Sequence, residues 1–208
     1  MAKVKICGIT RLEDALMCAK FGADALGFNF YEKSKRFIKP SEAGSILEQL
    51  DDRFSKFGVF VNSTVDEILD VVNIARINVI QLHGDESPEF VADLRSKTDT
   101  PIVKAFRVTE VFEVSFLTNY LVDAALLDSF SIDEFGGTGK KFNWSRAVSA
   151  MEIGFPIYLA GGLDPENVAE AVRIFRPYAV DVASGVESTP GRKDPAKVEA
   201  FIRNAKQA

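Results

Sequence analysis

Short apolar runs rich in Val, Ile, Leu and Phe recur along the whole chain, separated by segments with helical periodicity. Near-continuous apolar runs of this kind are typical of strands that helices bury on both faces. The intervening segments carry apolar residues at the i, i+3, i+4, i+7 spacing of an amphipathic helix. The pattern predicts a parallel sheet with crossover helices, with strands at residues 4–6, 25–30, 57–61, 79–82, 102–106, 124–127, 157–160 and 179–183.

Eight strand–helix units in succession favour a closed (β/α)8 barrel over an open doubly wound sheet, because closure leaves no exposed sheet edge. The chain has 208 residues, of which 47% are hydrophobic, so it is long enough for one sizeable core and short for two domains. No linker rich in Pro, Gly or Ser divides it. We therefore expect residues 1–208 to form a single-domain TIM barrel of the α/β class.

Several helix starts are marked by capping residues. Thr10 and Glu13 fit the Thr-x-x-Glu capping box, so we expect a helix to begin directly after the first strand. A capping side chain followed by proline at the first helical position predicts further helix starts at Ser87-Pro88, Asp164-Pro165 and Asp194-Pro195.

Composition and charge exclude several classes of protein. A formal net charge of −5 gives no basic surface for nucleic acid, and no apolar run is long enough to cross a membrane. The N-terminus lacks the apolar core of a signal peptide, and two cysteines do not make a disulfide framework. We expect a cytoplasmic protein with reduced thiols, no metal site and no obligatory protein partner.

The barrel places functional residues at the carboxyl ends of the strands. Cys7 ends the first strand, where a thiolate could act as a base, although a small buried residue is the alternative interpretation. Lys5 would stand two residues behind Cys7 on the same face and lower the pKa of the thiol. Asp181, on the inward face of the eighth strand, could equally well pair with Lys5.

Asp128 leaves the apolar sixth strand at the same end of the barrel, where burial would suit a general acid. An ordinary loop cap is the alternative. His83, the only histidine, follows the fourth strand and is expected to line the pocket or to bond locally. A hydrolytic Cys7–His83 pair is a weaker possibility, because neither residue lies in a nucleophile motif.

Glycine-rich stretches follow the last three strands, where barrels bind phosphate through backbone N–H groups. They predict a small phosphorylated substrate. Arg36, in the basic loop after the second strand, could clamp a carboxylate with two hydrogen bonds. The candidate phosphate-binding residues are Gly137, Gly139, Gly161, Gly162, Ser184 and Gly185.

Seven motifs together resemble phosphoribosylanthranilate isomerase. They run nearly end to end in the order of that family, and Cys-Gly-Ile-Thr and Ser-Gly-Val-Glu are the most specific of them. The motifs are Lys5-Ile6-Cys7-Gly8-Ile9-Thr10, Gly58-Val59-Phe60-Val61-Asn62, Gln81-Leu82-His83-Gly84, Leu127-Asp128, Gly136-Gly137-Thr138-Gly139, Gly161-Gly162-Leu163 and Asp181-Val182-Ala183-Ser184-Gly185-Val186-Glu187.

The resemblance implies a barrel enzyme of tryptophan biosynthesis that rearranges N-(5-phosphoribosyl)anthranilate without a cofactor. It implies that Cys7 is the general base, Asp128 the general acid and Arg36 the ligand of the anthranilate carboxylate. Lys35 and Phe37 depart from the Pro and Tyr that often flank this arginine in the family. Two alternatives remain: a barrel isomerase of another phosphorylated aminoaldose, which generally employs two carboxylates, and a barrel that binds a phosphorylated metabolite without turnover.

Overall fold

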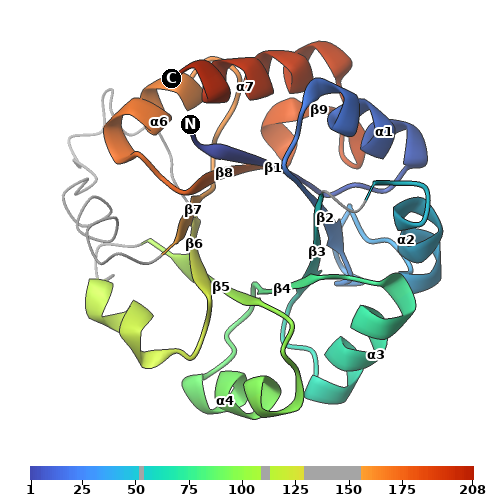
Figure 1. The fold of residues 1–208 in the computed structure, drawn as a ribbon, viewed down its shortest axis with the longest axis vertical. Helices are drawn as coiled ribbons and strands as arrows, with labels where there is room; N and C mark the ends of the chain where they lie inside the picture. Colours follow the sequence, from blue (N-terminus) through green and yellow to red (C-terminus); the bar gives the residue numbers. More distant parts are fainter. Residues whose placement is uncertain (52–53, 109–112, 129–155) are drawn as a thin grey trace.

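The computed structural model describes residues 1–51, 54–108, 113–128 and 156–208. Its eight parallel strands form a closed barrel in chain order, and β1 pairs with both β2 and β8 (Figure 1). The predicted barrel and all eight predicted strands are confirmed. The strands are β1 (Lys3–Cys7), β2 (Ala25–Asn29), β3 (Ser55–Phe60), β4 (Val79–Leu82), β5 (Ile102–Arg107), β6 (Ala124–Asp128), β7 (Ile157–Leu159) and β8 (Ala179–Val182).

Helices surround the ring of strands on its outside (Figure 1). In the described residues β5 is followed by a 3-10 helix rather than an α-helix, and a short hairpin of β9 and β10 follows β8. None of the described helices is long and apolar enough to cross a membrane. These elements are α1 (Leu12–Phe21), α2 (Pro40–Leu47), α3 (Val65–Ala75), α4 (Pro88–Lys97), η1 (Val114–Asn119), α6 (Val168–Phe175), η3 (Ser184–Val186), β9 (Glu187–Thr189), β10 (Arg192–Lys193) and α7 (Pro195–Gln207).

Strand alternation divides the side chains between the barrel interior and the layer beneath the helices. In β1, Val4 and Ile6 are fully buried in the cluster that β1 shares with α1 and α7. Lys5, on the opposite face, is also fully buried but points into the barrel, where Phe57 lies beneath its ammonium group. Cys7 follows on the same face as Lys5. The first strand therefore presents its thiol toward the mouth of the barrel.

A helix begins directly after β1, as predicted, and the helix starts at Ser87-Pro88 and Asp194-Pro195 are confirmed, whereas the capping box at Thr10 and the helix start at Asp164-Pro165 are wrong. Ser87 and Asp194 cap α4 and α7 by accepting hydrogen bonds from main-chain N–H groups. The Thr10 hydroxyl instead donates to the Gly191 carbonyl at 2.7 Å, so it ties α1 to the β9–β10 turn and caps nothing. The Asp164 carboxylate accepts from the N–H groups of a preceding turn, and α6 begins only at Val168.

Candidate active site

A pocket of about 280 Å³ opens at the carboxyl ends of the strands. Asn29, Val59, Gln81 and other strand-end residues form part of its wall. Another hollow, of about 200 Å³, lies at the opposite end of the strands around Lys3 and Tyr178, and Lys5 is the one predicted site residue in its wall. The carboxyl-end pocket gathers most of the predicted site residues, namely Cys7, Arg36, His83, Asp128, Gly161, Gly162, Asp181 and Ser184.

Gly137 and Gly139 lie outside the described residues. Gly185 is described but does not line the pocket. No group of three or more His, Cys, Asp or Glu side chains is placed to hold a metal ion in the described part of the chain.

Cys7 sits above a buried ion pair. The Lys5 ammonium donates to Asp181 Oδ1 at 2.9 Å, and these two residues are direct neighbours in the β1–β8 register. The predicted Lys5–Asp181 pair is confirmed. Burial disfavours the ammonium, but the charges of Asp181 and Cys7 outweigh it and raise the pKa of Lys5.

The pKa of Cys7 differs from the sequence-based expectation. Burial raises it above the ordinary value for a thiol, and the charge of Asp181 adds to that increase. Lys5 and Lys193 act in the opposite direction without cancelling the effect of burial. Lys5 therefore lowers the pKa of Cys7 as expected, but burial of the strand end outweighs it, and the net shift is upward. In the free protein Cys7 is predominantly a thiol at neutral pH.

Two glycines make room for the groups at this mouth. A Cβ atom at Gly27 on the neighbouring strand would lie 2.7 Å from the sulfur of Cys7. A Cβ atom at Gly8 would meet the Arg36 side chain, and Gly8 also has a φ of 76°, which favours glycine. Both glycines therefore allow the thiol and the guanidinium to occupy the same end of the barrel.

Asp128 belongs to a chain of polar side chains that crosses the pocket. Its Oδ2 lies 3.0 Å from Nε2 of His83, and Nδ1 of His83 lies 2.8 Å from Nε2 of Gln81. An amide N–H can only donate, so His83 accepts at Nδ1 and donates from Nε2 to Asp128. Both ring nitrogens of His83 are thereby used, which disfavours the hydrolytic Cys7–His83 pair. Gln81 is 1% exposed, and its side-chain oxygen has no partner among the described residues.

Arg36 is held by a carboxylate of the protein itself. Its Nε donates to Glu187 Oε1 at 2.8 Å and its Nη2 to Oε2 at 2.7 Å, so one edge of the guanidinium is engaged with two hydrogen bonds. Ser34 accepts from the Arg36 main-chain N–H and from Asn29 at the end of β2, which folds the loop back onto that strand. Arg36 still lines the pocket, and its side chain is 25% exposed.

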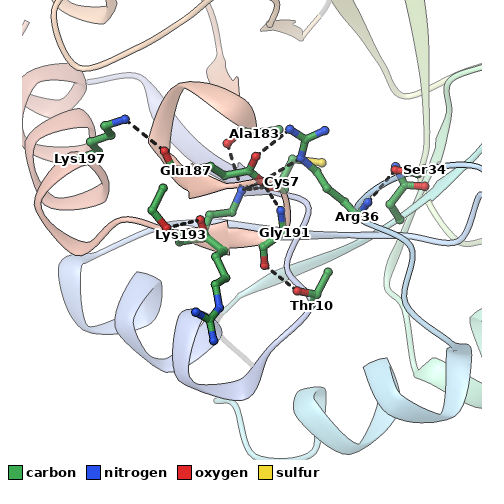
Figure 2. A network of polar contacts seen from close by, with 12 residues as sticks. Cys7, Thr10, Ser34, Arg36, Ala183, Glu187, Gly191, Lys193 and Lys197 are labelled. Carbon is green, nitrogen blue, oxygen red and sulfur yellow. Dashed lines mark hydrogen bonds and ion pairs between the residues drawn. The ribbon is translucent and has the colours of Figure 1, made fainter.

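Lys193 of the hairpin completes this network (Figure 2). Its buried ammonium donates to the Cys7 carbonyl at 2.6 Å, the Ala183 carbonyl at 3.1 Å and Glu187 Oε1 at 3.0 Å. Burial works against the Glu187 carboxylate, but Arg36 and Lys193 outweigh it and lower the pKa of Glu187. The hairpin therefore touches the ends of both β1 and β8.

The small-residue stretches after β7 and β8 lie side by side. Gly161 and Gly162 have φ angles of 86° and 65°, which favour glycine, and Ser184 is exposed at the start of η3. A Cβ atom at Gly185 would overlap the carbonyl oxygen of Leu163 in the preceding loop. The close contact between the two loops therefore explains the glycine at position 185. Contact with a bound anion is not needed to explain the absence of a side chain there.

Sequence reasoning missed three residues of the site. Glu187 stands in a quoted motif but received no role, and neither Gln81 nor Lys193 was identified as a contact of a site residue. The Pro190-Gly191 turn was an available signal for the hairpin that carries Lys193. Gln81 lies two residues before His83, which follows β4. Strand alternation therefore predicts that both side chains face inward, and this was a similar signal for Gln81.

Comparisons with known proteins agree with this architecture. The sequence profile of the N-(5'-phosphoribosyl)anthranilate (PRA) isomerase family matches residues 4–204. The chain is 50% identical over 208 residues to the N-(5'-phosphoribosyl)anthranilate isomerase of Trichlorobacter lovleyi, with 100% of both chains covered. It is 50% identical over 206 residues to that of Geobacter metallireducens, covering 99% of this chain and 100% of the relative.

Solved structures give the same result. The phosphoribosyl anthranilate isomerase of Thermotoga maritima superposes with a TM-score of 0.89 at 43% identity, with 100% of both chains covered. A phosphoribosyl anthranilate isomerase in complex with reduced 1-(o-carboxyphenylamino)-1-deoxyribulose 5-phosphate gives 0.88 at 41% identity, again over 100% of both. This chain therefore belongs to the phosphoribosylanthranilate isomerase family, the isomerases that act on phosphoribosylanthranilate in tryptophan biosynthesis.

Proposed function

We propose that this enzyme converts N-(5-phosphoribosyl)anthranilate to 1-(2-carboxyphenylamino)-1-deoxyribulose 5-phosphate, with Asp128 as general acid and Cys7 as general base. Asp128 gives its proton to the ribose ring oxygen as the bond from that oxygen to C1 breaks, which leaves an iminium at C1. Cys7 removes the proton from C2, and the electron pair of that bond forms the C1–C2 double bond of an enolamine. Proton transfer from the C2 hydroxyl to C1 then gives the ketone.

The observation that carries this proposal is the placement of Cys7 and Asp128 in one pocket, on strands three positions apart around the barrel. The ring oxygen and C2 are the two ring neighbours of C1, so an acid and a base on separate strands can each reach one of them in the same bound sugar. The His83 N–H that donates to Oδ2 of Asp128 adds support. In a protonated carboxyl group the carbonyl oxygen is the better hydrogen-bond acceptor. Because Oδ2 accepts from His83, the proton of the acid form belongs on Oδ1. After that proton has left, the same His83 N–H stabilises the carboxylate.

A raised pKa of the Cys7 thiol suits this order of steps. The base is needed only after ring opening, when the substrate carries a positive nitrogen beside the C2 proton. That charge makes C2–H acidic and also favours the thiolate, as any nearby cation does. The thiol would therefore lose its proton to solvent only once the intermediate has formed, and the thiolate would then take the proton from C2. Asp128 regains its proton from solvent at the end of the cycle.

The direct test is an assay of the purified protein with phosphoribosylanthranilate, followed by loss of substrate fluorescence and by identification of the ketose product. Consumption with formation of that product is expected. Binding without turnover would instead identify a barrel that only holds the metabolite. Turnover of a different phosphorylated aminoaldose in preference to this substrate would favour the other isomerase. The buried Lys5–Asp181 pair argues against that reaction, because it neutralises the second carboxylate of the pocket.

We expect Arg36→Met to raise KM roughly tenfold or more while changing kcat little. The arginine would bind the anthranilate carboxylate in the ground state and the transition state alike, so its loss removes uniform binding. Steady-state kinetics measure both constants. Lys35→Met, at an exposed basic position of the same loop, is the matched control and should leave KM unchanged. A selective fall in kcat would contradict the assignment of Arg36 as a carboxylate ligand.

The phosphate is proposed to bind the loops after β7 and β8, mainly through backbone N–H groups with the Ser184 hydroxyl beside them. Replacing Gly161 would not test the phosphate site cleanly, because Gly161 has a φ of 86° and any other residue would strain the backbone there. Ser184→Ala should weaken inorganic phosphate and substrate about tenfold in parallel, the cost of one hydrogen bond to a charged group. Titration calorimetry measures the first and KM the second. The exposed Ser188→Ala is the control, and equal phosphate affinity of the two variants would rule out the Ser184 hydroxyl as a ligand of the anion.

A further inference from the structure

The network around Lys193 joins the proposed base to the proposed carboxylate ligand, and no role in the reaction has yet been given to its two inner members. We propose that Lys193 and Glu187 are positioning residues that hold the Cys7 strand end and the Arg36 guanidinium in one fixed arrangement. Figure 2 shows Lys193 between Cys7, Ala183 and Glu187, with Arg36 reaching Glu187 from the opposite side. This inference rests on the proposed roles of Cys7 and Arg36.

The hydrogen bonds of Lys193 leave its ammonium little freedom. The group has three protons and three oxygen acceptors, the carbonyls of Cys7 and Ala183 and one oxygen of Glu187. Lys193 is 5% exposed, so water does not compete strongly for these protons. The two carbonyls belong to the ends of neighbouring strands. Lys193 therefore fixes the backbone at Cys7 relative to β8 and keeps a positive charge at this strand end.

Glu187 fixes Arg36 in a similar way. Its carboxylate binds the Nε and Nη2 edge of the guanidinium, and its Oε1 also accepts from Lys193 and from the Gly191 N–H. The Arg36 donors that remain are on the Nη1 side, and that edge is the one a substrate carboxylate can bind. Without Lys193, the negative charge of Glu187 would neutralise the positive charge of Arg36. With Lys193 present, the three residues carry one net positive charge to match an anionic substrate.

The two residues should be distinguishable by experiment, because only Lys193 acts on the thiol. Lys193 is among the charges that lower the pKa of Cys7, whereas burial raises it. Removal of Lys193 should therefore move the formation of the Cys7 thiolate to higher pH. Glu187 should affect Arg36, and thus substrate binding, with little change at the thiol.

The first measurement is the rate of Cys7 alkylation by iodoacetamide as a function of pH. Lys193→Met should move the inflection to higher pH, so that alkylation below it slows about tenfold. Lys197→Met is the matched control, since the exposed Lys197 donates to the main-chain carbonyl of Glu187 and not to its carboxylate. Cys18 does not interfere, because burial raises its pKa to about 12. Coincident profiles for the two lysine variants would overturn the role of Lys193.

The second measurement is the separation of KM from kcat. Glu187→Gln should raise KM for phosphoribosylanthranilate roughly tenfold, because Arg36 would no longer be held in place to bind the substrate carboxylate. The pH profile of Cys7 alkylation should stay that of the parent. Glu199→Gln, at an exposed acidic position of α7, should change neither. A Glu187→Gln variant that keeps the parental KM would overturn the role of Glu187.

Lys193→Met leaves Glu187 buried with one cation fewer and can fold poorly for that reason alone. The double variant Lys193→Met with Glu187→Gln removes both charges, so no buried carboxylate is left with one cation fewer, and the Arg36 charge that remains is on a partly exposed side chain. It should still show the alkaline shift of alkylation, and a parental profile in this variant would refute the proposal. Alkylation does not depend on the isomerase reaction. If Cys7→Ala retained full turnover, the base assignment would fail while the effect of Lys193 on the thiol would still be measurable.

Discussion

Replacing Cys7 by alanine should lower kcat by roughly three orders of magnitude while leaving the affinity for the product nearly unchanged. A proton-abstracting group acts mainly in the transition state, and general base catalysis typically contributes a factor of about 10² to 10⁴. The substitution removes only a sulfur atom beneath Gly27, so the strand and its Lys5–Asp181 pair should persist. Single-turnover kinetics give the rate of the chemical step, and titration with a product analogue gives the affinity.

Cys18→Ala provides the control for this experiment, because Cys18 is the other thiol of the chain but is fully buried between α1 and the barrel, whereas the half-buried Cys7 lines the pocket. It should keep the parental kcat even if it lowers thermal stability somewhat. Bound product should also slow the alkylation of Cys7. Turnover close to that of the parent in Cys7→Ala would remove this residue from the mechanism.

Asp128→Asn should cause a comparably large fall in kcat, by a factor of roughly 10² to 10⁴. An amide cannot supply the proton for ring opening, although it has nearly the same shape and can still accept a hydrogen bond from His83. KM should therefore change much less than kcat. Asp85→Asn is the matched control, because Asp85 is an exposed carboxylate in the loop after β4 and should be replaceable without loss. Equal kcat values for the two variants would rule out Asp128 as the acid.

The strands could be predicted from sequence because two-sided burial leaves a local signature, a continuous apolar run, that needs no knowledge of neighbours. The ends of the strands then identified Cys7, His83 and Asp128 as residues that share one pocket. The same reasoning paired Lys5 with Asp181, since inward parity on adjacent strands suffices to bring them together. Each of these predictions depends on chain periodicity and barrel closure, and both are properties of the backbone.

Other features could not be predicted because they depend on side chains that meet only after folding. The Thr10 hydroxyl fits a capping box by spacing, yet it donates to Gly191, a residue distant in sequence. The box does occur at Thr64 and Glu67, where both of its hydrogen bonds form. Arg36 was expected to keep its guanidinium for a ligand, but the buried Glu187 engages one edge of it. The pKa of Cys7 depends on how much water the folded strand end retains, which spacing in the sequence does not reveal.

The hydrogen bond from Lys193 to the Cys7 carbonyl joins residues that are 186 positions apart. During synthesis the N-terminal part of a chain emerges first, and contacts between distant residues form slowly because a long loop must close. A nascent chain that ends before β9 already contains Cys7, Arg36 and Asp128 but has neither Glu187 nor Lys193. Its β1 can pair with β8 only after residues 179–182 have left the ribosome. We therefore expect turnover in a coupled translation reaction to begin only after β8 and the β9–β10 hairpin have emerged, because barrel closure and the Lys193 contact both require them.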